Sequence, residues 1–542
     1  MPLFILILGV ALRLKHYFEN RSLWLDEAWL GTSINSRDYS EILKRVEIFP
    51  GFPEPPIIFN LIEKFFVNTL GNNEMVLRLF PLICGILALG GFYLLAKRFL
   101  EGRLLLLALA LFAVGEPLVY YAAELKQYST DLLVTIALLL LADRYLDKVM
   151  GWLDCLLWGV LGALLLWVSN ASIFILPAIA CAFSWNAYLN RRLFKNYFPT
   201  TLMYALWMAS FIALYCLSLS QMVGNHELMK NWRGSLLGGD ASFLQALQFL
   251  GNIVTESFKN PGALGWPVLG VFLFGLGAWR LIKTNAARAL LLLLPVFLVF
   301  LAAVLGKYPS RGRLILFLVP IYYIVIILGL DASKEFIKSQ YEKVVLIALS
   351  VVLLAFPLKE MAYYLIHSRT QVENRDVLEV FNRLYKPGDF IYLNTSGQFA
   401  FLYYASSLGY GKLFPQYLIG QVNGELQYGM TIGKFARFVG EQDGASYIYY
   451  QKEYDSFKDG VFKVYYTSDK DEPNMVFKDK FYDYPETHRT WVFLSRAPEE
   501  DDVQINKWIV DSFEKRGKRI MGYERKGAAI YLYEMNKKVP LL

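Results

Sequence analysis

Two adjacent carboxylates, Asp26 and Glu27, follow directly after the first apolar segment of the chain. An ionisable side chain close to hydrocarbon is costly unless it is paired, hydrated or used in a reaction. A carboxylate that is partly shielded from water can take a proton from an incoming nucleophile, which makes Asp26 a candidate general base. The structural alternative is that Asp26 caps a short interfacial helix that begins near Ala28.

A third acidic residue, Glu54, lies in the stretch Pro53-Glu54-Pro55-Pro56. The prolines fix φ and remove backbone donors, so the chain must turn stiffly and present Glu54 at a defined place. Such turns are more often architectural than catalytic. We therefore consider Glu54 only as a candidate substrate-binding residue.

The stretch from Tyr120 to Tyr128 combines tyrosines with charged residues. If a helix begins here, Tyr121, Glu124, Tyr128 and Asp131 share one face at spacings of three, four and three. The structural alternative is that Glu124 and Lys126 anchor the chain at the membrane interface and that the tyrosines belong to an aromatic belt. This alternative explains the position of Tyr128 well, but it does not explain why Asp131 lies a turn deeper. Tyr121, Glu124, Lys126 and Tyr128 are therefore further candidate binding residues.

A basic segment, residues 307–313, contains Arg311 and Arg313. Guanidinium groups bind phosphate oxygens in bidentate fashion, so this segment is a candidate site for the phosphate of a lipid-linked donor. The alternative is that the same cations anchor lipid headgroups.

The composition indicates which elements must hold these side chains. Of the 542 residues, 56% are hydrophobic and 19% are charged, and the mean hydropathy is +0.36. Such a chain is too apolar for a soluble protein of ordinary composition. Runs of about 17 to 22 apolar residues, each long enough to cross a roughly 30 Å hydrocarbon core, recur from residue 1 to about 365. They predict roughly eleven spanning helices, at 1–18, 78–97, 104–121, 128–146, 153–169, 172–189, 199–219, 263–282, 289–306, 314–330 and 344–364.

The net charge of +7 does not indicate a nucleic-acid partner, because Lys and Arg concentrate in alternate short loops. That distribution orients membrane proteins, and it predicts that these loops are cytoplasmic. An odd number of spans then places the C-terminal region outside the cytoplasm. The predicted cytoplasmic groups are Lys97, Arg98 and Arg103; Arg144 and Lys148; Arg191, Arg192 and Lys195; Arg280, Lys283 and Arg288; and Lys334, Lys338 and Lys343.

All four cysteines fall inside predicted spans and are expected to be small buried side chains, without a disulfide framework or a cysteine metal cluster. The first apolar segment lacks a small-residue cleavage site, so we expect a retained helix and not a signal peptide. Two long external loops are predicted at 19–77 and 220–261. Amphipathic stretches within them, at 39–46, 57–70 and 243–254, are expected to lie at the membrane interface.

After about residue 367 the sequence becomes mixed polar and aromatic with no further spanning run. The chain thus divides into a transmembrane domain, residues 1–366, and a soluble α/β domain, residues 367–542. Within the second domain we predict helices near 377–384 and 503–513, and strands at 389–394, 446–450, 491–495 and 529–534. No phosphate loop, His/Cys ligand spacing or nucleophile elbow is found there, so no chemistry is assigned to this domain.

Three motifs together resemble the C superfamily of glycosyltransferases (GT-C), in the group that contains the protein O-mannosyltransferases and the lipid A aminoarabinose transferase. The first is Leu25-Asp26-Glu27 after the first helix, and the second is Pro55-Pro56 followed by residues 74–81, which are similar to the family's "PP…E…RLP" stretch. The third, residues 121–128, is similar to the family's "YSQEARMYA" stretch. Gly312-Arg313 before a helix containing Pro320 is a weaker fourth match.

The resemblance implies a polytopic GT-C-like membrane enzyme that transfers a sugar from a polyprenyl phosphate to a lipid, glycan or protein acceptor on the external face of the plasma (inner) membrane. It places Asp26 in the position of the catalytic carboxylate. Two departures concern the donor phosphate. Glu54 stands where members often have His or Lys, and Lys126 replaces the usual Arg, so Arg311 and Arg313 are expected to take a larger share of phosphate binding.

The hypothesis is an inverting transfer in which Asp26 accepts the acceptor's proton while Lys126, Arg311 and Arg313 stabilise the leaving phosphate. Glu124 would orient a substrate, and Glu27 would hold Lys126 or a divalent metal, although no coordination set is defined. The principal alternative is a transporter or flippase of a lipid-linked saccharide, in which the same charges line a pathway. A non-catalytic scaffold leaves those charges unexplained.

Overall fold

The computed structural model describes residues 1–45, 54–189, 197–220, 233–237, 242–386, 389–393, 397–408, 420–422, 425–427, 437–442, 445–449, 464–465, 487–495, 506–507, 509–511, 513–515 and 517–536. The chain forms two compact units. A helical unit contains residues 1–19, 51–63 and 78–368, and a sheet unit contains residues 20–50, 64–77 and 369–542. These units differ from the predicted domains because two parts of the first long loop belong with the C-terminal residues.

The helical unit consists of helices and short helical turns joined by brief connections. They are α1 (Pro2–Phe18), the first part of α4 (Ile57–Leu70), α6 (Leu79–Ala96), α7 (Gly102–Val114), α8 (Glu116–Tyr120), η1 (Tyr121–Ala123), α9 (Tyr128–Tyr145), α10 (Trp152–Val168), α11 (Ser172–Leu189), α12 (Tyr197–Leu214), η2 (Tyr215–Leu219), η3 (Arg233–Ser235), α15 (Phe243–Lys259), α16 (Pro267–Thr284), α17 (Ala286–Val304), η4 (Gly312–Leu318), α18 (Val319–Ala332), η5 (Ser333–Phe336) and α19 (Glu342–Ile366).

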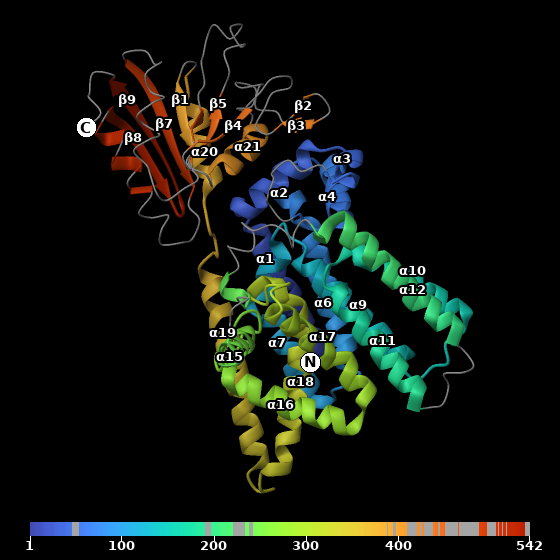
Figure 1. Cartoon of the computed structure of the whole chain (residues 1–542). Coiled ribbons are helices and arrows are strands. Elements are labelled where there is room, and N and C mark those ends of the chain that lie inside the picture. The colour runs from blue at the N-terminus through green and yellow to red at the C-terminus, as the bar shows by residue number, and fades with distance from the viewer. Residues whose placement is uncertain are drawn as a thin grey trace. The chain divides into compact units, whose positions relative to one another are not determined.

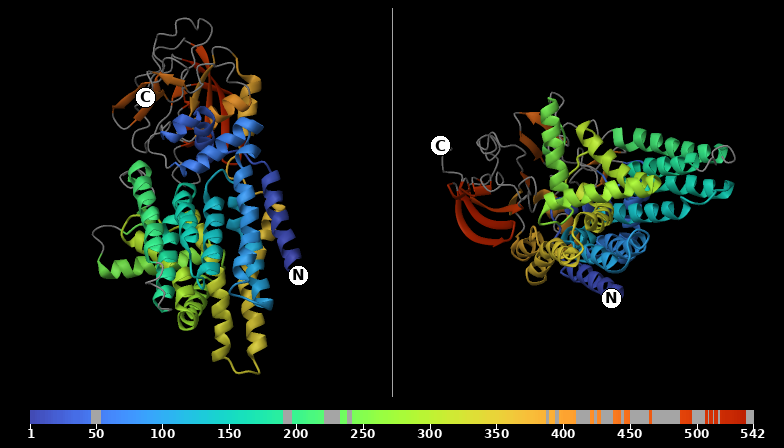
Figure 2. Two further views of the ribbon diagram at one scale, coloured as in Figure 1. Left: turned by 90° about the vertical axis from the view of Figure 1, so that its right-hand side faces the viewer. Right: turned by 90° about the horizontal axis from the view of Figure 1, so that it is seen from below.

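Helix α18 lies at the centre of this unit, and nearly all of its side chains are buried. Its neighbour α16 approaches so closely that glycines are required on both helices. A Cβ atom at Gly277 would lie 1.9 Å from the Val325 carbonyl oxygen, and one at Gly329 would lie 1.8 Å from the Leu273 carbonyl oxygen. Small residues at a helix interface permit such contact between membrane helices. At the far end of α18 the chain passes through η5 into α19, and this turn projects from the end of the unit (Figures 1 and 2).

The number of spanning helices differs from the predicted eleven. Seven helices of the described residues are long and apolar enough to cross a membrane, or eight if the bent pair α7 and α8 forms one span. Helices α1, α9 and α10 occupy predicted spans but do not meet that criterion, because α1 and α10 have only 17 residues and α9 carries charged residues. The chain is a multi-pass membrane protein, but the parity of eleven spans no longer orients its C-terminal region.

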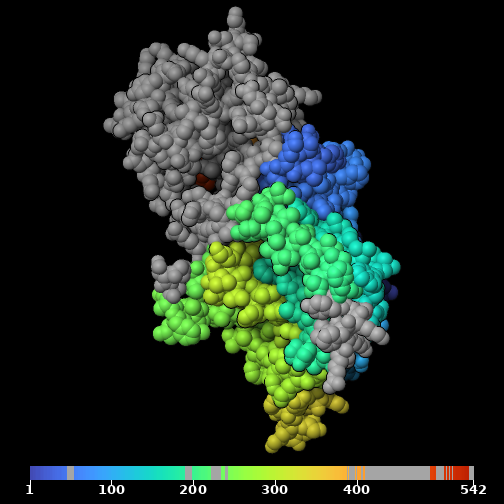
Figure 3. All heavy atoms as spheres, turned by 45° about the vertical axis from the view of Figure 1, so that its right-hand side comes forward, coloured from blue at the N-terminus to red at the C-terminus, as the bar shows by residue number. Residues whose placement is uncertain are grey.

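Apolar side chains cover the outer surface of the helical unit. Helices α10 and α12 pack against each other, and the surface of this pair is visible in teal and green in Figure 3. Exposed side chains on the pair include Trp152, Leu156, Leu164 and Met208. A contiguous exposed apolar surface of this kind is typical of helices that face hydrocarbon.

Ion pairs gather several predicted cytoplasmic loops at one end of the helical unit. The buried carboxylate of Asp143 accepts hydrogen bonds from Arg98 Nε at 2.6 Å and from Arg288 Nε at 2.8 Å. Asp331 pairs with both Arg280 and Lys334. The connections after α6, α9, α16 and α18 are therefore held at the same end, as the charge pattern predicts.

The sheet unit combines three short N-terminal helices and the end of a fourth with the C-terminal α/β elements. They are α2 (Leu25–Ser36), α3 (Tyr39–Leu43), the end of α4, α5 (Glu74–Leu77), α20 (Asn374–Leu384), β1 (Phe390–Leu393), α21 (Gly397–Ser407), β2 (Gly420–Val422), β3 (Glu425–Gln427), β4 (Arg437–Gln442), β5 (Ala445–Tyr449), β6 (Val464–Tyr465), β7 (Thr487–Ser495), β8 (Gly517–Arg525) and β9 (Ala528–Asn536).

The main sheet has five strands in the order β6-β1-β7-β9-β8 (Figure 1). Strand β1 pairs in parallel with β6 and β7, whereas β9 pairs antiparallel with β7 and β8. Successive side chains of β7 point to opposite faces of the sheet, and each face packs against a different part of the core, as expected for a strand that is covered on both faces. Trp491 contacts the ring of Phe381 in α20, and Val492 packs with Ile509 and Phe513.

The α/β prediction for the C-terminal region is confirmed in its main elements. Helix α20 and strands β1, β5, β7 and β9 fall at the predicted positions, whereas the elements not predicted are α21, β2, β3, β4, β6 and β8. The predicted helix at 503–513 lies partly outside the described residues.

Candidate functional site

A buried cluster of acidic, basic and aromatic side chains lies at the end of the helical unit opposite the Asp143 ion pairs. We call Tyr121, Glu124, Tyr128 and Arg313 the Arg313 cluster. Helix α9 runs from Tyr128 to Tyr145, next to Asp143, and α18 runs from just after η4 to Ala332, next to Lys334. The lengths of these two helices therefore separate the cluster from the ion-paired end.

The backbone around Glu124 differs from the sequence expectation. The predicted helix through Tyr121, Glu124 and Tyr128 is wrong, because η1 ends at Ala123, Glu124 has extended dihedral angles of −128° and 134°, and α9 begins only at Tyr128. The break still brings the two tyrosine rings together at 5.3 Å between centroids. Ser129 Oγ donates a hydrogen bond to the Tyr121 carbonyl oxygen at 2.8 Å, which closes this turn.

Arg313 enters the cluster from η4. The chain reverses at Gly312, whose φ of +52° is readily adopted only by glycine. Arg313 Nη1 lies 3.8 Å from Glu124 Oε1, and the guanidinium lies 5.7 Å from the centre of the Tyr128 ring. The Glu124 side chain is buried, whereas 22% of the Arg313 side chain is exposed. Part of the Arg313 side chain is therefore accessible to a ligand, while Glu124 and Tyr128 lie against its guanidinium.

Lys126 and Tyr308 lie beside this cluster. Lys126 is 4% exposed, and its backbone N–H donates to the Glu124 carbonyl oxygen at 2.7 Å. Burial raises the pKa of Tyr308 well above its usual range, so the hydroxyl keeps its proton and donates to the Leu314 carbonyl oxygen at 2.7 Å. This bond ties the loop before η4 to the segment that carries Arg313.

Arg311 occupies a different position from Arg313. It is exposed and precedes η4, and its Nη1 atom lies 3.8 Å from the position a Cβ atom would take on Gly234. Gly234 belongs to the predicted external loop 220–261, of which residues 221–232 and 238–241 lie outside the described part. The helix predicted in that loop is confirmed as α15, whose first turn leaves Phe243 and Leu244 exposed, and its position at the membrane interface stays a prediction.

Glu54 precedes α4 in the helical unit. Its carboxylate accepts a hydrogen bond from Asn60 Nδ2 at 3.4 Å, so it is tied to the first turns of the helix that follows the paired prolines. One turn farther along, Glu63 is fully buried, and neither of its oxygens has a hydrogen-bond partner among the described residues. Glu63 was not predicted as a site residue, because a single acid in an amphipathic helix is ordinary.

Asp26 and Glu27 lie in the first turn of α2, in the sheet unit. The structural alternative that Asp26 caps a helix near Ala28 is wrong, because α2 begins at Leu25 and its N-cap residue is Trp24. A carboxylate in the first turn is favoured by the partial positive charge of the helix N-terminus. Glu27 is 1% exposed, and Asp26 is half-buried. The convergence of Asp26 with the Arg313 cluster stays a prediction.

Asp131 is satisfied inside the helical unit. Ser169 Oγ donates to Asp131 Oδ1 at 2.6 Å, and both side chains are buried. The hydrogen bond from Ser169 explains why Asp131 is tolerated inside the helical unit, which anchoring at the membrane interface did not explain. Asp131 therefore does not need a substrate contact.

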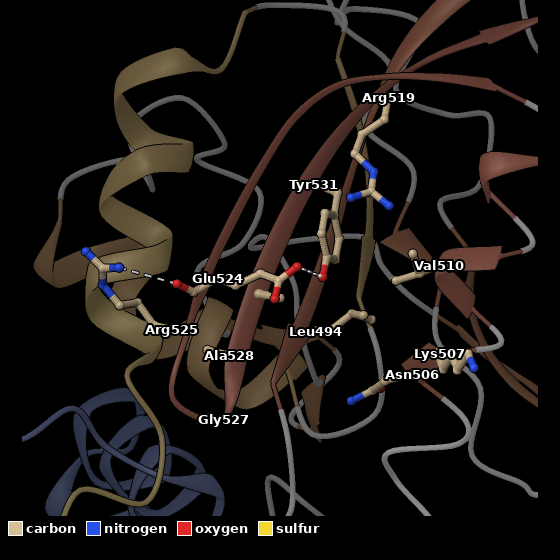
Figure 4. Close-up of a pocket in the computed structure, with 11 residues that line it drawn as sticks. Leu494, Asn506, Lys507, Val510, Arg519, Glu524, Arg525, Gly527, Ala528 and Tyr531 are labelled. Carbon is tan, nitrogen blue, oxygen red and sulfur yellow. Dashed lines mark hydrogen bonds between the residues drawn. The ribbon is translucent and has the colours of Figure 1, made fainter.

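The sheet unit carries a hollow of about 370 Å³ on the outer part of its main sheet (Figure 4). Tyr531 donates a hydrogen bond to Glu524 Oε1 at 2.7 Å, and the Arg519 guanidinium lies 5.0 Å from the centre of the same ring. The hollow contains no predicted site residue. Its remaining lining residues are Leu494, Asn506, Lys507, Val510, Arg525, Gly527, Ala528 and Ala529.

No metal centre is formed by the residues that the structure describes. Among them, no group of three or more His, Cys, Asp or Glu side chains is arranged to hold a metal ion. All four cysteines are free; Cys84 and Cys155 are buried as expected, but Cys181 and Cys216 are exposed on the helical surface. Metal binding by Glu27 stays a prediction.

Comparison with known proteins finds a family that matches part of the chain. Residues 54–216 match the family of dolichyl-phosphate-mannose-protein mannosyltransferases. The matched segment contains Glu54, Tyr121, Glu124, Lys126 and Tyr128. The match confirms the predicted resemblance for this part of the chain and supports the enzyme class that the resemblance implies. No curated protein matches the sequence.

Solved structures with a similar arrangement include ArnT from Cupriavidus metallidurans. In the apo state it has 12% sequence identity and a TM-score of 0.49, with 97% of both chains covered. The same protein bound to undecaprenyl phosphate has 11% identity and a TM-score of 0.47, again with 97% of both chains covered. The oligosaccharyltransferase of Archaeoglobus fulgidus has 12% identity and a TM-score of 0.45. That alignment covers 72% of this chain but only 62% of the length of the oligosaccharyltransferase.

Proposed function

We propose that this protein is a membrane glycosyltransferase that moves a sugar from a polyprenyl-phosphate-linked donor to an acceptor on the extracytoplasmic face of the membrane. Transfer would invert the configuration at the anomeric carbon, with Asp26 as the general base. The observation that carries the proposal is the family match over residues 54–216, together with the Arg313 cluster, to which the matched segment contributes Tyr121, Glu124 and Tyr128.

The geometry of Arg313 supports a role at a phosphate. A leaving phosphate gains negative charge in the transition state, so a cation fixed in advance in a poorly hydrated place stabilises that state more than the ground state. Arg313 meets this requirement because Glu124 and Tyr128 lie against its guanidinium while part of its side chain stays accessible. In the proposal Lys126 and Arg311 assist at the same phosphate, and Tyr121, Tyr128 and Glu54 contribute to substrate binding.

The reaction needs no chemistry beyond one displacement. The acceptor hydroxyl or amine attacks the anomeric carbon and gives its proton to Asp26, while the bond between that carbon and the phosphate oxygen breaks. The phosphate leaves with the electron pair of that bond and needs no proton. Glu27, next to Asp26, is assigned to holding a cation near the base, either Lys126 or a divalent metal.

The proposed orientation places the Arg313 cluster at the external end of the helical unit. The ion pairs at Asp143 and Asp331 support a cytoplasmic position for the opposite end, because four of the cation-rich connections meet there. If α1, α9, α10 and the bent pair also cross the membrane, the spans number eleven, as the sequence suggests. The C-terminal α/β region is then extracytoplasmic, in the plasma (inner) membrane.

A transfer assay tests the proposal. Membranes containing the protein are incubated with a panel of radiolabelled polyprenyl phosphate sugars, and wild type is compared with Asp26→Asn and with Asp147→Asn as a control at the opposite end. We expect transfer of at least one sugar, loss of at least about 100-fold in Asp26→Asn, and no change in the control. Undiminished transfer by a folded Asp26→Asn protein would remove Asp26 as the base.

The same assay separates the alternative function. A transporter or flippase would move the labelled lipid across the bilayer of a vesicle without transferring its sugar. Translocation without transfer, unaffected by Asp26→Asn, would replace the proposed enzyme with a flippase.

A further inference from the structure

Three residues in the segment before α2, Asn20, Ser22 and Leu23, are bonded to helices that lie far away in the sequence. The Leu23 backbone N–H donates to the Tyr404 hydroxyl at 2.9 Å, and Asn374 Nδ2 donates to the Leu23 carbonyl oxygen at 3.0 Å. Tyr404 belongs to α21 and Asn374 begins α20. Both polar groups of the Leu23 backbone are therefore held from the C-terminal region.

Arg375 forms hydrogen bonds with two residues that precede Leu23, namely Ser22 and Asn20. Its backbone N–H donates to Ser22 Oγ at 3.1 Å, and its Nη2 group donates to the Asn20 carbonyl oxygen at 2.7 Å. Asn20 has a φ of 44°, in the left-handed region that non-glycine residues rarely adopt. The turn that leads into α2 thus depends on a bond from the Arg375 guanidinium.

A buried carboxylate connects the two holding side chains. Glu74 Oε1 accepts a hydrogen bond from Arg375 Nη1 at 2.8 Å and another from the Tyr404 hydroxyl at 3.0 Å. Glu74 and Tyr404 are both buried, and only 23% of the Arg375 side chain is exposed. We call Glu74, Arg375 and Tyr404 the Glu74 cluster. Bonds to an ionised group in such a place are short and directional, so the cluster is rigid.

Packing along α2 prevents the helix from turning about its axis. Ala28, Trp29 and Leu30 are fully or almost fully buried. A Cβ atom at Gly31 would lie 3.1 Å from both the Tyr403 ring and Leu77, so α2 rests closely on α21 and α5. The Glu74 cluster fixes where α2 begins, and this packing fixes its rotation. Together they determine the position of Asp26 in the first turn.

We infer that Glu74, Arg375 and Tyr404 are positioning residues that hold the first turn of α2 so that Asp26 meets the acceptor in a reactive geometry. The inference rests on the proposed role of Asp26. It gives the C-terminal α/β region a part in the reaction, because two of the three residues come from α20 and α21. A displacement of about 1 Å at a reacting group can lower a rate by about 100-fold, so loss of these bonds acts on turnover.

Conservative variants test this inference. Tyr404→Phe removes only the hydroxyl that joins Leu23 to Glu74, and Arg375→Lys keeps a cation that cannot bond to Asn20 and Glu74 in the same fork geometry. Tyr523→Phe is the matched control, since it removes a tyrosine hydroxyl from β8 in the same unit. The measurements are kcat and KM for the lipid donor, normalised to the folded fraction, and the thermal unfolding midpoint.

We expect kcat to fall by about 10- to 100-fold in Tyr404→Phe and Arg375→Lys, with KM for the donor and the unfolding midpoint close to wild type. Tyr523→Phe should match wild type in all three. If Asp26→Asn abolishes transfer but both positioning variants retain wild-type kcat, the inference is overturned and the proposed function stands. A rise in KM alone, or a loss of kcat matched by a loss of folded protein, also overturns it. If Asp26→Asn transfers sugar normally, the proposed role of Asp26 as the base fails, and the inference that rests on it fails as well.

Discussion

Glu63 should make the folded helical unit less stable as the pH rises. Burial raises its pKa well above the ordinary value, and neither oxygen has a hydrogen-bond partner among the described residues. A buried carboxyl group without such partners is more stable as the neutral acid. The informative substitution is Glu63→Gln, which keeps the size and polarity of the side chain but removes its titratable proton.

The sign of the effect follows from proton binding. Between the ordinary pKa of glutamate, about 4.3, and the raised pKa in the folded protein, the folded state holds a proton that the unfolded chain has released. The free energy of unfolding therefore falls by about 1.4 kcal/mol for each pH unit within this window. The contribution of Glu63 is greatest below the ordinary pKa and is lost as the pH approaches the folded-state pKa. Glu63→Gln has no such slope.

The assay is thermal unfolding of the detergent-solubilised protein from about pH 5 to about pH 8, at one scan rate because large membrane proteins unfold irreversibly. The unfolding midpoint of Glu63→Gln should rise relative to wild type by about 1–2 °C for each pH unit. Glu335→Gln, which changes an exposed glutamate of the same unit, is the control and should run parallel to wild type. A difference between Glu63→Gln and wild type that does not change with pH would refute the reasoning. A Glu63→Gln protein that is less stable at every pH would mean that the carboxylate is charged and paired.

Three other substitutions have expected outcomes. Gly162→Ala should lower the free energy of unfolding by about 1–3 kcal/mol, because its Cβ would lie 2.2 Å from Trp207 Nε1; Gly275→Ala, where nothing lies within 4 Å, should be neutral or stabilising in the same denaturation assay. Asp143→Asn should cost about 1–3 kcal/mol by leaving two arginines without their shared partner, and an unchanged unfolding midpoint would argue against that role. Arg313→Ala should lower kcat/KM for the lipid donor by about 10- to 100-fold, with partial recovery in Arg313→Lys. Equal kcat/KM values in wild type and Arg313→Ala would remove Arg313 from the donor site.

The sequence predicted those features that depend on local patterns. Apolar runs located α6, α11, α17 and α19 to within a few residues, because the length and hydrophobicity of a span are properties of consecutive residues. Alternation located β7 and β9 for the same reason. The helix expected through Glu124 failed because side-chain spacing does not reveal an extended break such as the one between η1 and α9.

Features that depend on distant contacts were not predictable from the pattern. The Arg313 cluster joins residues almost two hundred positions apart, and only the resemblance to a family suggested that they belong together. Glu74 was noted as part of a motif, but nothing in the sequence suggested that it binds Arg375 and Tyr404. A buried ionic group of this kind depends on which helices meet, and that information is absent from any short window.

The bond between Leu23 and Tyr404 spans 381 positions of the polypeptide. Because a ribosome produces the N-terminus first, the segment around Asp26 is made long before its supports exist. This segment lacks its hydrogen-bond partners until the whole helical unit has been synthesised and α20 and α21 have left the ribosome. The surroundings of Asp26, the proposed base, would then be completed late, and a nascent chain ending at residue 368 would carry membrane helices without the residues that hold α2.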